Sequence, residues 1–240
     1  RCIYSHMKKF KLWIVFSLLF FFVPFEQQSM AAENLQQLID EAAPNSTIQL
    51  ENKTYSGPVN ITKPITIIGD ERTKIQSKTT GFSIQNTKNV VLKSLQFQTK
   101  KAPILVEGSE SVELTDLQFK IDEEAIQLKN VKNASISDIE IEGMQDVHFS
   151  KKPNGMNVFD SFNIHVEGVS IDNIQDGIYF EEVEDVQVSK AHVKNGRYGL
   201  HFMYGNQIEL TKNTVQHNVT GFTIMVVTDL LLQDNVVEKQ

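Results

Sequence analysis

Residues 177–193 read GIYFEEVEDVQVSKAHV and residues 199–215 read GLHFMYGNQIELTKNTV, so one spacing of apolar residues returns after 22 positions. The same pattern starts at seven places, which are Gly81, Pro103, Ala125, Gly155, Gly177, Gly199 and Gly221. Successive starts are 22 residues apart, except that 8 further residues separate Ala125 from Gly155. A fixed period of this length indicates a solenoid, in which each repeat stacks on its neighbours.

Each repeat contains three short runs in which apolar residues alternate with other residues. Five columns of the repeat are apolar in all seven copies, for example Phe82, Ile104, Ile126, Met156, Ile178, Leu200 and Phe222. Alternation with a period of two predicts β-strands with one buried face. We therefore predict an all-β fold, a right-handed parallel β-helix with 22-residue rungs, whose hand follows from the usual chirality of parallel connections.

A sixth column changes along the chain. Its members are Leu95, Leu117, Ile139, Val169 and Ala191, followed by Asn213 and Asn235. Asparagine amides stacked on successive strands can hydrogen-bond to one another and to the backbone of a turn. We expect an asparagine ladder in the last two rungs.

The first 32 residues are expected to be a signal peptide. Lysines follow Met7, an apolar run extends from Leu12 to Phe25, and small residues precede a plausible cleavage point. Residues 1–6 precede the first methionine and are expected to be non-native sequence. We therefore expect export, to the periplasm or to the outer face of the cytoplasmic membrane.

The remaining chain divides into a cap and the solenoid. Residues 33–47 have apolar residues at helical spacing before Pro44, which predicts a short helix that caps the first rung. Residues 48–240 are predicted to form the β-helix, with less regular coils before residue 75. The sequence stops within a rung, so we expect the β-helix to be incomplete at its C-terminal end.

Composition excludes several classes of function. The chain has 240 residues, a net charge of -7 and no basic stripe, so nucleic acid is not an expected partner. Its only cysteine, Cys2, excludes a disulfide framework and a thiolate metal site. The sequence implies no required cofactor.

The outward positions of the first run change character late in the chain. One of them reads Ser83, Leu105, Gln127, Asn157, Tyr179, His201 and Thr223, and the next reads Gln85, Glu107, Lys129, Phe159, Glu181, Met203 and Met225. Met203 and Met225 should stack on adjacent strands, with His201 two residues from Met203 on the same face. Two thioethers and an imidazole suit Cu(I), whereas an exposed apolar patch suits a protein partner.

His201, Met203 and Met225 are therefore candidate copper ligands, or part of a docking surface together with Arg197 and Tyr204. Tyr179 and Glu181 are secondary candidates on the same face.

A further secondary candidate, His148, lies in the insertion at residues 142–154, which is either a binding loop or a decorative one. Three other histidines, His165, His192 and His217, are expected to be exposed to solvent.

An enzyme that processes acidic polysaccharides is the alternative from another class, because many β-helices of the pectin-lyase-like class do so. Such enzymes need clustered carboxylates on a strand face. The only dense acidic group comprises Asp176, Glu181, Glu182, Glu184 and Asp185, and most of it falls in a turn, where a solvated face is expected. We therefore do not expect catalysis.

The late rungs resemble the NosD family. The specific stretches are RYGLHFMY at Arg197–Tyr204 and GFTIM at Gly221–Met225, and the segment at residues 35–70 is also similar to that family. The resemblance implies an extracytoplasmic β-helix protein that binds copper and assists maturation of nitrous oxide reductase. It implies the ATPase and membrane subunits of an ABC transporter as partners, so that the chain is membrane-associated through them, together with a copper chaperone or a client cuproenzyme.

Carried over by motif, Arg197, His201, Met203, Tyr204 and Met225 form the candidate functional face. Two other functions stay open: a polysaccharide lyase, hydrolase or epimerase, and a passive surface protein that binds glycans.

Overall fold

The computed structural model describes residues 33–70 and 72–239. The expected signal peptide at residues 1–32, with its residues 1–6, lies outside the described residues. Within the described part of the chain, no helix has the length and apolar character needed to cross a membrane.

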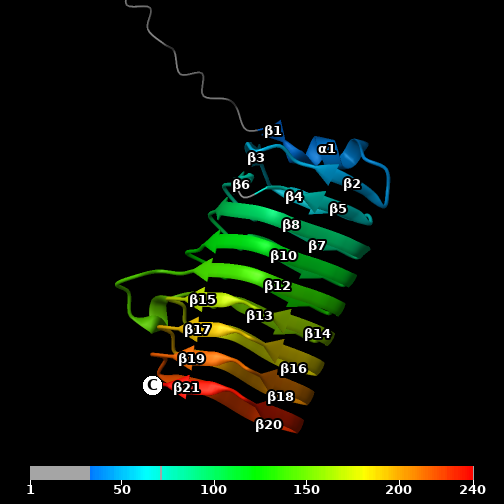
Figure 1. The fold of residues 1–240 in the computed structure, drawn as a ribbon. Helices are drawn as coiled ribbons and strands as arrows, with labels where there is room; N and C mark the ends of the chain where they lie inside the picture. The colour runs from blue at the N-terminus through cyan, green and yellow to red at the C-terminus, as the bar shows by residue number, and fades with distance from the viewer. Residues whose placement is uncertain (1–32, 71, 240) are drawn as a thin grey trace, which may run out of the picture. The chain divides into compact units, whose positions relative to one another are not determined.

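The described residues form a parallel β-solenoid, in which each rung contributes strands to three faces (Figure 1). The first face comprises β4 (Val59–Ile61), β7 (Phe82–Gln85), β9 (Ile104–Glu107), β11 (Ile126–Lys129) and β13 (Met156–Phe159), and then the first parts of β16 (Asp176–Ser189), β18 (Tyr198–Thr211) and β20 (Thr220–Gln233). The second face comprises β2 (Ser46–Gln49), β5 (Ile65–Ile68), the first parts of β8 (Lys88–Thr99), β10 (Glu110–Lys120) and β12 (Lys132–Glu142), then β14 (Phe162–Glu167) and the second parts of β16, β18 and β20. The third face comprises β1 (Glu33–Asn34), β3 (Thr54–Ser56), β6 (Lys74–Ser77), the second parts of β8, β10 and β12, then β15 (Ser170–Asp172), β17 (His192–Lys194), β19 (Thr214–Gln216) and β21 (Val236–Glu238).

The register of the strands follows the repeat in the sequence. Phe82 pairs with Ile104 and Ile104 with Ile126, a step of 22 residues. Across the insertion, Ile126 pairs with Met156, a step of 30. The sequence-based prediction of a parallel β-helix with 22-residue rungs is confirmed.

The core lies inside the coil and is lined by the predicted apolar columns. The side chains of Ile104, Ile126, Ile178 and Leu200 in one such column have no exposed surface. In the last rung the same columns are more open, and Leu232 is 48% exposed, because no described residue stacks beyond β20.

A short helix, α1 (Leu35–Glu41), covers the first rung. It begins after Asn34, whose side-chain oxygen accepts a hydrogen bond from the Gln36 amide at 3.1 Å. Leu35 and Ile39 are buried on its inner face. The helix is shorter than the segment at residues 33–47, because the chain becomes extended at Ala42, two residues before Pro44.

The expected asparagine ladder is present in the last rungs. Asn213 Nδ2 donates to Asn235 Oδ1 at 3.0 Å and Asn213 Oδ1 accepts from the Ala191 amide at 2.9 Å. Asn213 Nδ2 also donates to the Val188 carbonyl at 2.9 Å. These bonds satisfy backbone groups at a turn that apolar side chains fill in earlier rungs.

In the turns between strands, residues with a left-handed backbone conformation (positive φ) recur at the same position of each rung. After the first strand this position holds Asn86, Gly108, Asn130, Asp160, Glu182, Tyr204 and Val226, with φ between 49° and 58°. Glycine, asparagine and aspartate tolerate this conformation, but an aromatic and a β-branched residue are strained in it. The last two rungs therefore place exposed apolar side chains where polar residues are the usual choice.

Candidate functional site

The candidate site lies on the first face, where β16, β18 and β20 stack. Tyr179 pairs with His201, and Glu181 pairs with Met203. Met203 in turn pairs with Met225, so the predicted stacking of the two methionines is confirmed. Parallel strands stack directly at this register, which brings residues that are 22 apart in sequence to neighbouring positions.

A buried ion pair lies beside these strands. Both oxygens of Asp176 accept from Arg197, with Nε to Oδ1 and Nη2 to Oδ2 each 2.8 Å. The Asp176 side chain is 2% exposed and that of Arg197 is 32% exposed. The pKa of Arg197 is raised, mainly by the hydrogen bond to Asp176, while burial acts in the opposite direction. The bidentate geometry offsets the desolvation of a carboxylate that would otherwise be costly to bury.

The same carboxylate orients the candidate histidine. His201 Nδ1 lies 3.0 Å from Asp176 Oδ2, so Nδ1 carries the proton that this bond requires. His201 Nε2 is the other ring nitrogen and takes no part in this bond. This atom is buried and has no hydrogen-bond partner among the described residues. His201 therefore presents an oriented, unengaged nitrogen inside the site.

Aromatic rings enclose His201 on two sides. The ring centroid of Tyr179 lies 4.8 Å from that of the imidazole. The ring centroid of Tyr198 lies 4.9 Å from it, and the two ring planes meet at 74°. Arg197 lies over the Tyr198 ring at 4.4 Å, which holds that ring in place by a cation–π contact. The position of His201 is outward, as predicted, but its side chain is only 10% exposed because these neighbours cover it.

Tyr179 also contacts the candidate thioether. Its hydroxyl donates to Glu181 Oε2 at 2.8 Å and lies 3.4 Å from Met203 Sδ. The pKa of Tyr179 is raised to about 12, first by burial and then by the hydrogen bond to Glu181. The phenol therefore stays protonated near neutral pH. We call these residues the His201 cluster: Asp176, Tyr179, Glu181, Arg197, Tyr198, His201 and Met203.

Two sequence-predicted residues lie at the rim of the cluster rather than within it. Met225 is 47% exposed on the next rung, and Tyr204 is 51% exposed in the strained turn after Met203. Together with Val226, which is 68% exposed, they form an apolar rim on the solvent side.

The insertion contacts the cluster through its last residues. Asn154 Oδ1 accepts from the Asp176 amide at 3.2 Å, and the Pro153 carbonyl accepts from the Gln175 amide at 2.7 Å. The Arg197 amide donates to the Gln175 carbonyl at 2.6 Å. The insertion thus helps to fix the backbone that carries Asp176.

His148 lies elsewhere in that insertion. It precedes the short 3-10 helix η1 (Phe149–Lys151), and its Nδ1 lies 2.8 Å from Ser150 Oγ. Its ring is exposed and is tilted by 34° against the Phe149 ring, with 4.1 Å between the ring centroids. The structure does not bring His148 to the first face beside His201. His165, His192 and His217 are exposed, as the sequence predicts.

Two residues of the cluster were missed by sequence reasoning. The sequence places Asp176 in the same acidic group as the turn residues, which are expected to be solvated. In the structure Asp176 lies at the start of β16, before that turn, and its side chain is buried. Glu182 and Glu184, which do lie on the turn side, are exposed. Tyr198 pairs with Asp176 at the start of β18. The available signal was their shared place immediately before the repeat start, with Arg197 beside Tyr198.

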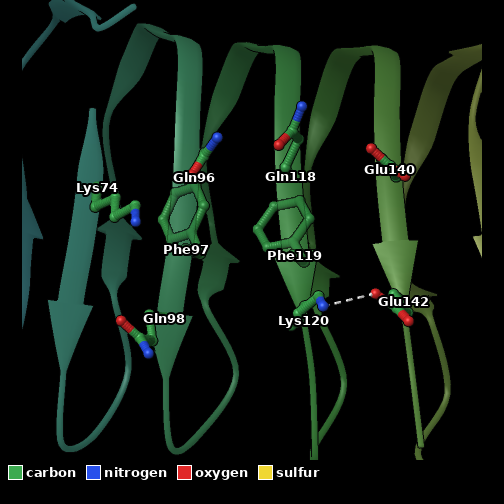
Figure 2. Close-up of a pocket in the computed structure, with 9 residues that line it drawn as sticks. All are labelled: Lys74, Gln96, Phe97, Gln98, Gln118, Phe119, Lys120, Glu140 and Glu142. Carbon is green, nitrogen blue, oxygen red and sulfur yellow. Dashed lines mark ion pairs between the residues drawn. The ribbon is translucent and has the colours of Figure 1, made fainter. Parts of the chain in front are cut away.

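A groove of about 410 Å³ on the third face offers different chemistry (Figure 2). It crosses β6, β8, β10 and β12 in the early rungs. Its lining is made of amides, charged groups and two phenyl rings, namely Lys74, Gln96, Phe97, Gln98, Gln118, Phe119, Lys120, Glu140 and Glu142. Lys120 Nζ forms an ion pair with Glu142 at 3.1 Å. The groove supplies no thioether or imidazole, so it is separate from the His201 cluster in composition and position.

The donor set of the cluster fits a soft monovalent cation. A histidine whose Nδ1–H is held by a carboxylate is the usual arrangement behind a metal-bound imidazole, because the carboxylate fixes the tautomer and raises basicity. A thioether prefers Cu(I) among biological cations. The described residues contain no group of three or more His, Cys, Asp or Glu side chains suited to a metal ion. A soft-cation site here would therefore need His201 and methionine sulfur together.

The solved structures that resemble this chain are parallel β-helix proteins. A Family 28 exopolygalacturonase from Yersinia enterocolitica has a TM-score of 0.69 at 9% identity, over 88% of this chain and 63% of its own. A polygalacturonase from Erwinia carotovora ssp. carotovora has a TM-score of 0.63 at 8% identity, over 87% and 77%. The pectate lyase Pel9A has a TM-score of 0.51 at 10% identity, over 83% and 73%. At these identities the likeness shows the fold, and the chain spans less than two thirds of the exopolygalacturonase.

A search of curated proteins found no match. A family model does match: residues 138–240 correspond to NosD, described as periplasmic copper-binding protein. This segment contains the insertion, the whole His201 cluster and the apolar rim. Over residues 138–240, less than half of its length, the chain is therefore similar to the NosD family.

Proposed function

We propose that this chain is an exported accessory subunit that binds Cu(I) as cargo at His201 and Met203 and passes it on for cuproenzyme maturation. In this proposal it works outside the cytoplasmic membrane with the ATPase and membrane subunits of an ABC transporter. A copper chaperone or a client enzyme such as nitrous oxide reductase would exchange copper with it.

The observation that carries the proposal is the coincidence of the family match with the His201 cluster. A family described as copper-binding matches residues 138–240, and that segment holds His201 with Asp176 behind Nδ1 and a free Nε2. Imidazole held in this way is a good ligand, and thioether sulfur adds selectivity for the monovalent ion.

The apolar rim supports a protein partner beside the cluster. Tyr204 is 51% exposed and has left-handed backbone on β18, a strand that is paired on both sides, whereas Met225 and Val226 lie on β20, beyond which no described residue stacks. An exposed aromatic side chain at such a position costs stability, so a function that uses Tyr204 is the natural explanation. A partner that docks on this rim would lie directly over Met203, where copper would be exchanged.

The polysaccharide alternative has less support from the geometry. Asp176 uses both oxygens on Arg197 and His201, and Glu181 accepts from Tyr179. Glycoside hydrolysis needs one carboxyl to give a proton and a second to act as base or nucleophile. Neither carboxylate in the cluster is free for such a role in this arrangement.

An anaerobic Cu(I) competition titration tests copper binding. We expect His201→Ala and Met203→Ala to weaken binding strongly, and Asp176→Asn to weaken it by about 10- to 100-fold, as is usual for the partner behind a ligating histidine. His165→Ala is the matched control, because His165 is exposed on the second face. Equal affinity in all variants would place the copper site elsewhere.

Association with a transporter is tested separately by co-purification from membranes. The wild-type chain is expected to retain an ABC ATPase and its membrane subunit, and the double variant Met225→Ser/Val226→Ser should reduce that yield. A wild-type chain that never associates contradicts the transporter part of the proposal. Turnover of uronate polymers that is lost in Glu181→Gln would instead support the enzyme alternative.

A further inference from the structure

Tyr179 is the only described aromatic residue for which the structure records contacts to both candidate ligands. Its ring lies 4.8 Å from the His201 ring, and its hydroxyl lies 3.4 Å from Met203 Sδ. Both contacts come from the neighbouring rung, since Tyr179 pairs with His201 in register. One side chain therefore contacts both the imidazole ring and the sulfur that would share a cation.

In this conformation the Nε2 atom of His201 is shielded from solvent. His201 Nε2 is buried and has no partner, although its side chain lies at an outward position of the strand. An unpartnered buried nitrogen is costly, because it has lost its hydrogen bond to water. Ring packing and the hydrogen bond from Tyr179 to Glu181 favour this conformation, whereas the unpartnered Nε2 of His201 disfavours it.

The two tyrosines against His201 are held by different contacts. Tyr198 lies under the Arg197 guanidinium, which is itself fixed by two hydrogen bonds to buried Asp176. Tyr179 is held by its hydrogen bond to the partly exposed Glu181 and by an edge contact with Phe159 at 5.8 Å. Rotation of the Tyr179 side chain would break the hydroxyl contacts with Glu181 and Met203 and leave the Asp176–Arg197 pair in place.

We propose that the Tyr179 side chain is a lid over the His201–Met203 pair, latched by Glu181, and that a soft cation reaches the pair only after the phenol turns away. The identity of the cation rests on the function proposed above, but the lid itself does not. In the closed arrangement His201 Nε2 is buried while Met203 is partly exposed, and opening would expose the nitrogen beside the sulfur. Copper release to a partner at the apolar rim would require the same opening.

The lid is tested without copper by the reactivity of the histidines toward diethylpyrocarbonate, followed residue by residue with mass spectrometry. His148, His165, His192 and His217 are exposed and serve as references within the same molecule. In the wild type, His201 should react at least about tenfold more slowly than these, because only the open fraction is reactive. Tyr179→Ala should bring His201 close to the reference rate, and Glu181→Gln should give an intermediate rate.

Phe162→Ala is the matched control, since Phe162 is an exposed aromatic residue on the second face, and it should leave the His201 rate unchanged. Circular dichroism and thermal unfolding of each variant confirm that the solenoid is intact. A His201 rate in folded Tyr179→Ala that stays as slow as in the wild type overturns the lid.

A stopped-flow measurement of anaerobic Cu(I) uptake separates the lid from the proposed function. Tyr179→Ala should take up Cu(I) several-fold faster than the wild type while its equilibrium affinity changes less. If His201 becomes reactive but no variant binds Cu(I), the lid stands and the copper proposal fails. If Cu(I) binds at equal rates with and without the phenol, the lid does not control access and is overturned.

Discussion

The early rungs and the late rungs of this solenoid share a core and differ on the outside. Ile104 and Leu200 occupy the same column and are equally buried. The outward neighbour of the first is Leu105, an apolar side chain, whereas the outward neighbour of the second is His201, held by a buried carboxylate. One scaffold therefore supports either a plain surface or an organised cluster.

The turns differ in the same direction. Asn86 and Asn130 occupy the left-handed position in early rungs, where asparagine fits, but Tyr204 and Val226 occupy it in late rungs. Late rungs thus give up local stability at the positions that border the cluster.

Replacing Asp176 by alanine should give the largest loss of stability. The change leaves the Arg197 guanidinium without its partner in a mostly buried place, which costs about 3 kcal/mol in comparable pairs. Chemical denaturation of both proteins measures the difference. The early-rung control is Asp116→Ala, because Asp116 is an exposed turn residue whose partner is Ser94, and it should be much milder. Equal losses of stability in the two variants would contradict the claim that Asp176 stabilises the fold as the buried partner of Arg197.

Exchanging the ladder column between regions should have a smaller effect. Asn213→Leu leaves the Ala191 amide and the Val188 carbonyl without partners, with an expected loss of about 2 kcal/mol. The reciprocal change, Leu117→Asn, buries an amide where the structure shows an apolar turn, and should also destabilise. Thermal unfolding of both variants tests the pair. If Asn213→Leu is neutral, the late turn does not depend on its asparagine.

Tyr179 should make stability fall at high pH. Its pKa in the folded chain is about 12, whereas an unfolded tyrosine ionises at about 10. The folded state therefore holds this proton more tightly, so the contribution is complete below pH 10 and is lost as pH rises through 12. Denaturation at several pH values should show this loss in the wild type and less of it in Tyr179→Phe. Tyrosinate absorbance should lose its step near pH 12 in the variant, and an unchanged titration would contradict the assignment.

The exposed pair between Glu167 and Lys190 should have the smallest effect. The atoms lie 2.6 Å apart, and the pKa of Glu167 is lowered by the hydrogen bond to Lys190. A lowered carboxyl pKa contributes stability above the unfolded pKa, and this contribution disappears as pH falls through the folded value. Both side chains are more than half exposed, so solvent screens the pair. Glu167→Gln should leave thermal unfolding nearly unchanged, and a large shift would show that exposed pairs matter here.

The sequence predicted the core far better than the site. A 22-residue period with alternating apolar residues determines which side chains face inward, and register follows because each strand pairs with its copy one rung away. The stacking of Met203 on Met225 and the contact between Asn213 and Asn235 follow from the same 22-residue spacing. These are properties of the repeat, so one sequence suffices to find them.

The centre of the site could not be predicted in this way. Asp176 sits at the edge of a strand, and whether it is buried depends on the side chains around it, here Arg197 and His201. The contact of Tyr179 with Met203 depends on rotamers, which the period does not determine. Asn154, at the end of the insertion, hydrogen-bonds to the Asp176 amide because the excursion returns to the solenoid there, and its path has no repeat to predict it.

X-ray absorption spectroscopy at the copper edge, on chain loaded anaerobically with Cu(I), tests most directly whether the late face is a soft-cation site. The account predicts imidazole and sulfur scattering in the first shell, with sulfur lost in Met203→Leu and imidazole lost in His201→Ala. Spectra that contain only light scatterers, or that do not change in either variant, would contradict it.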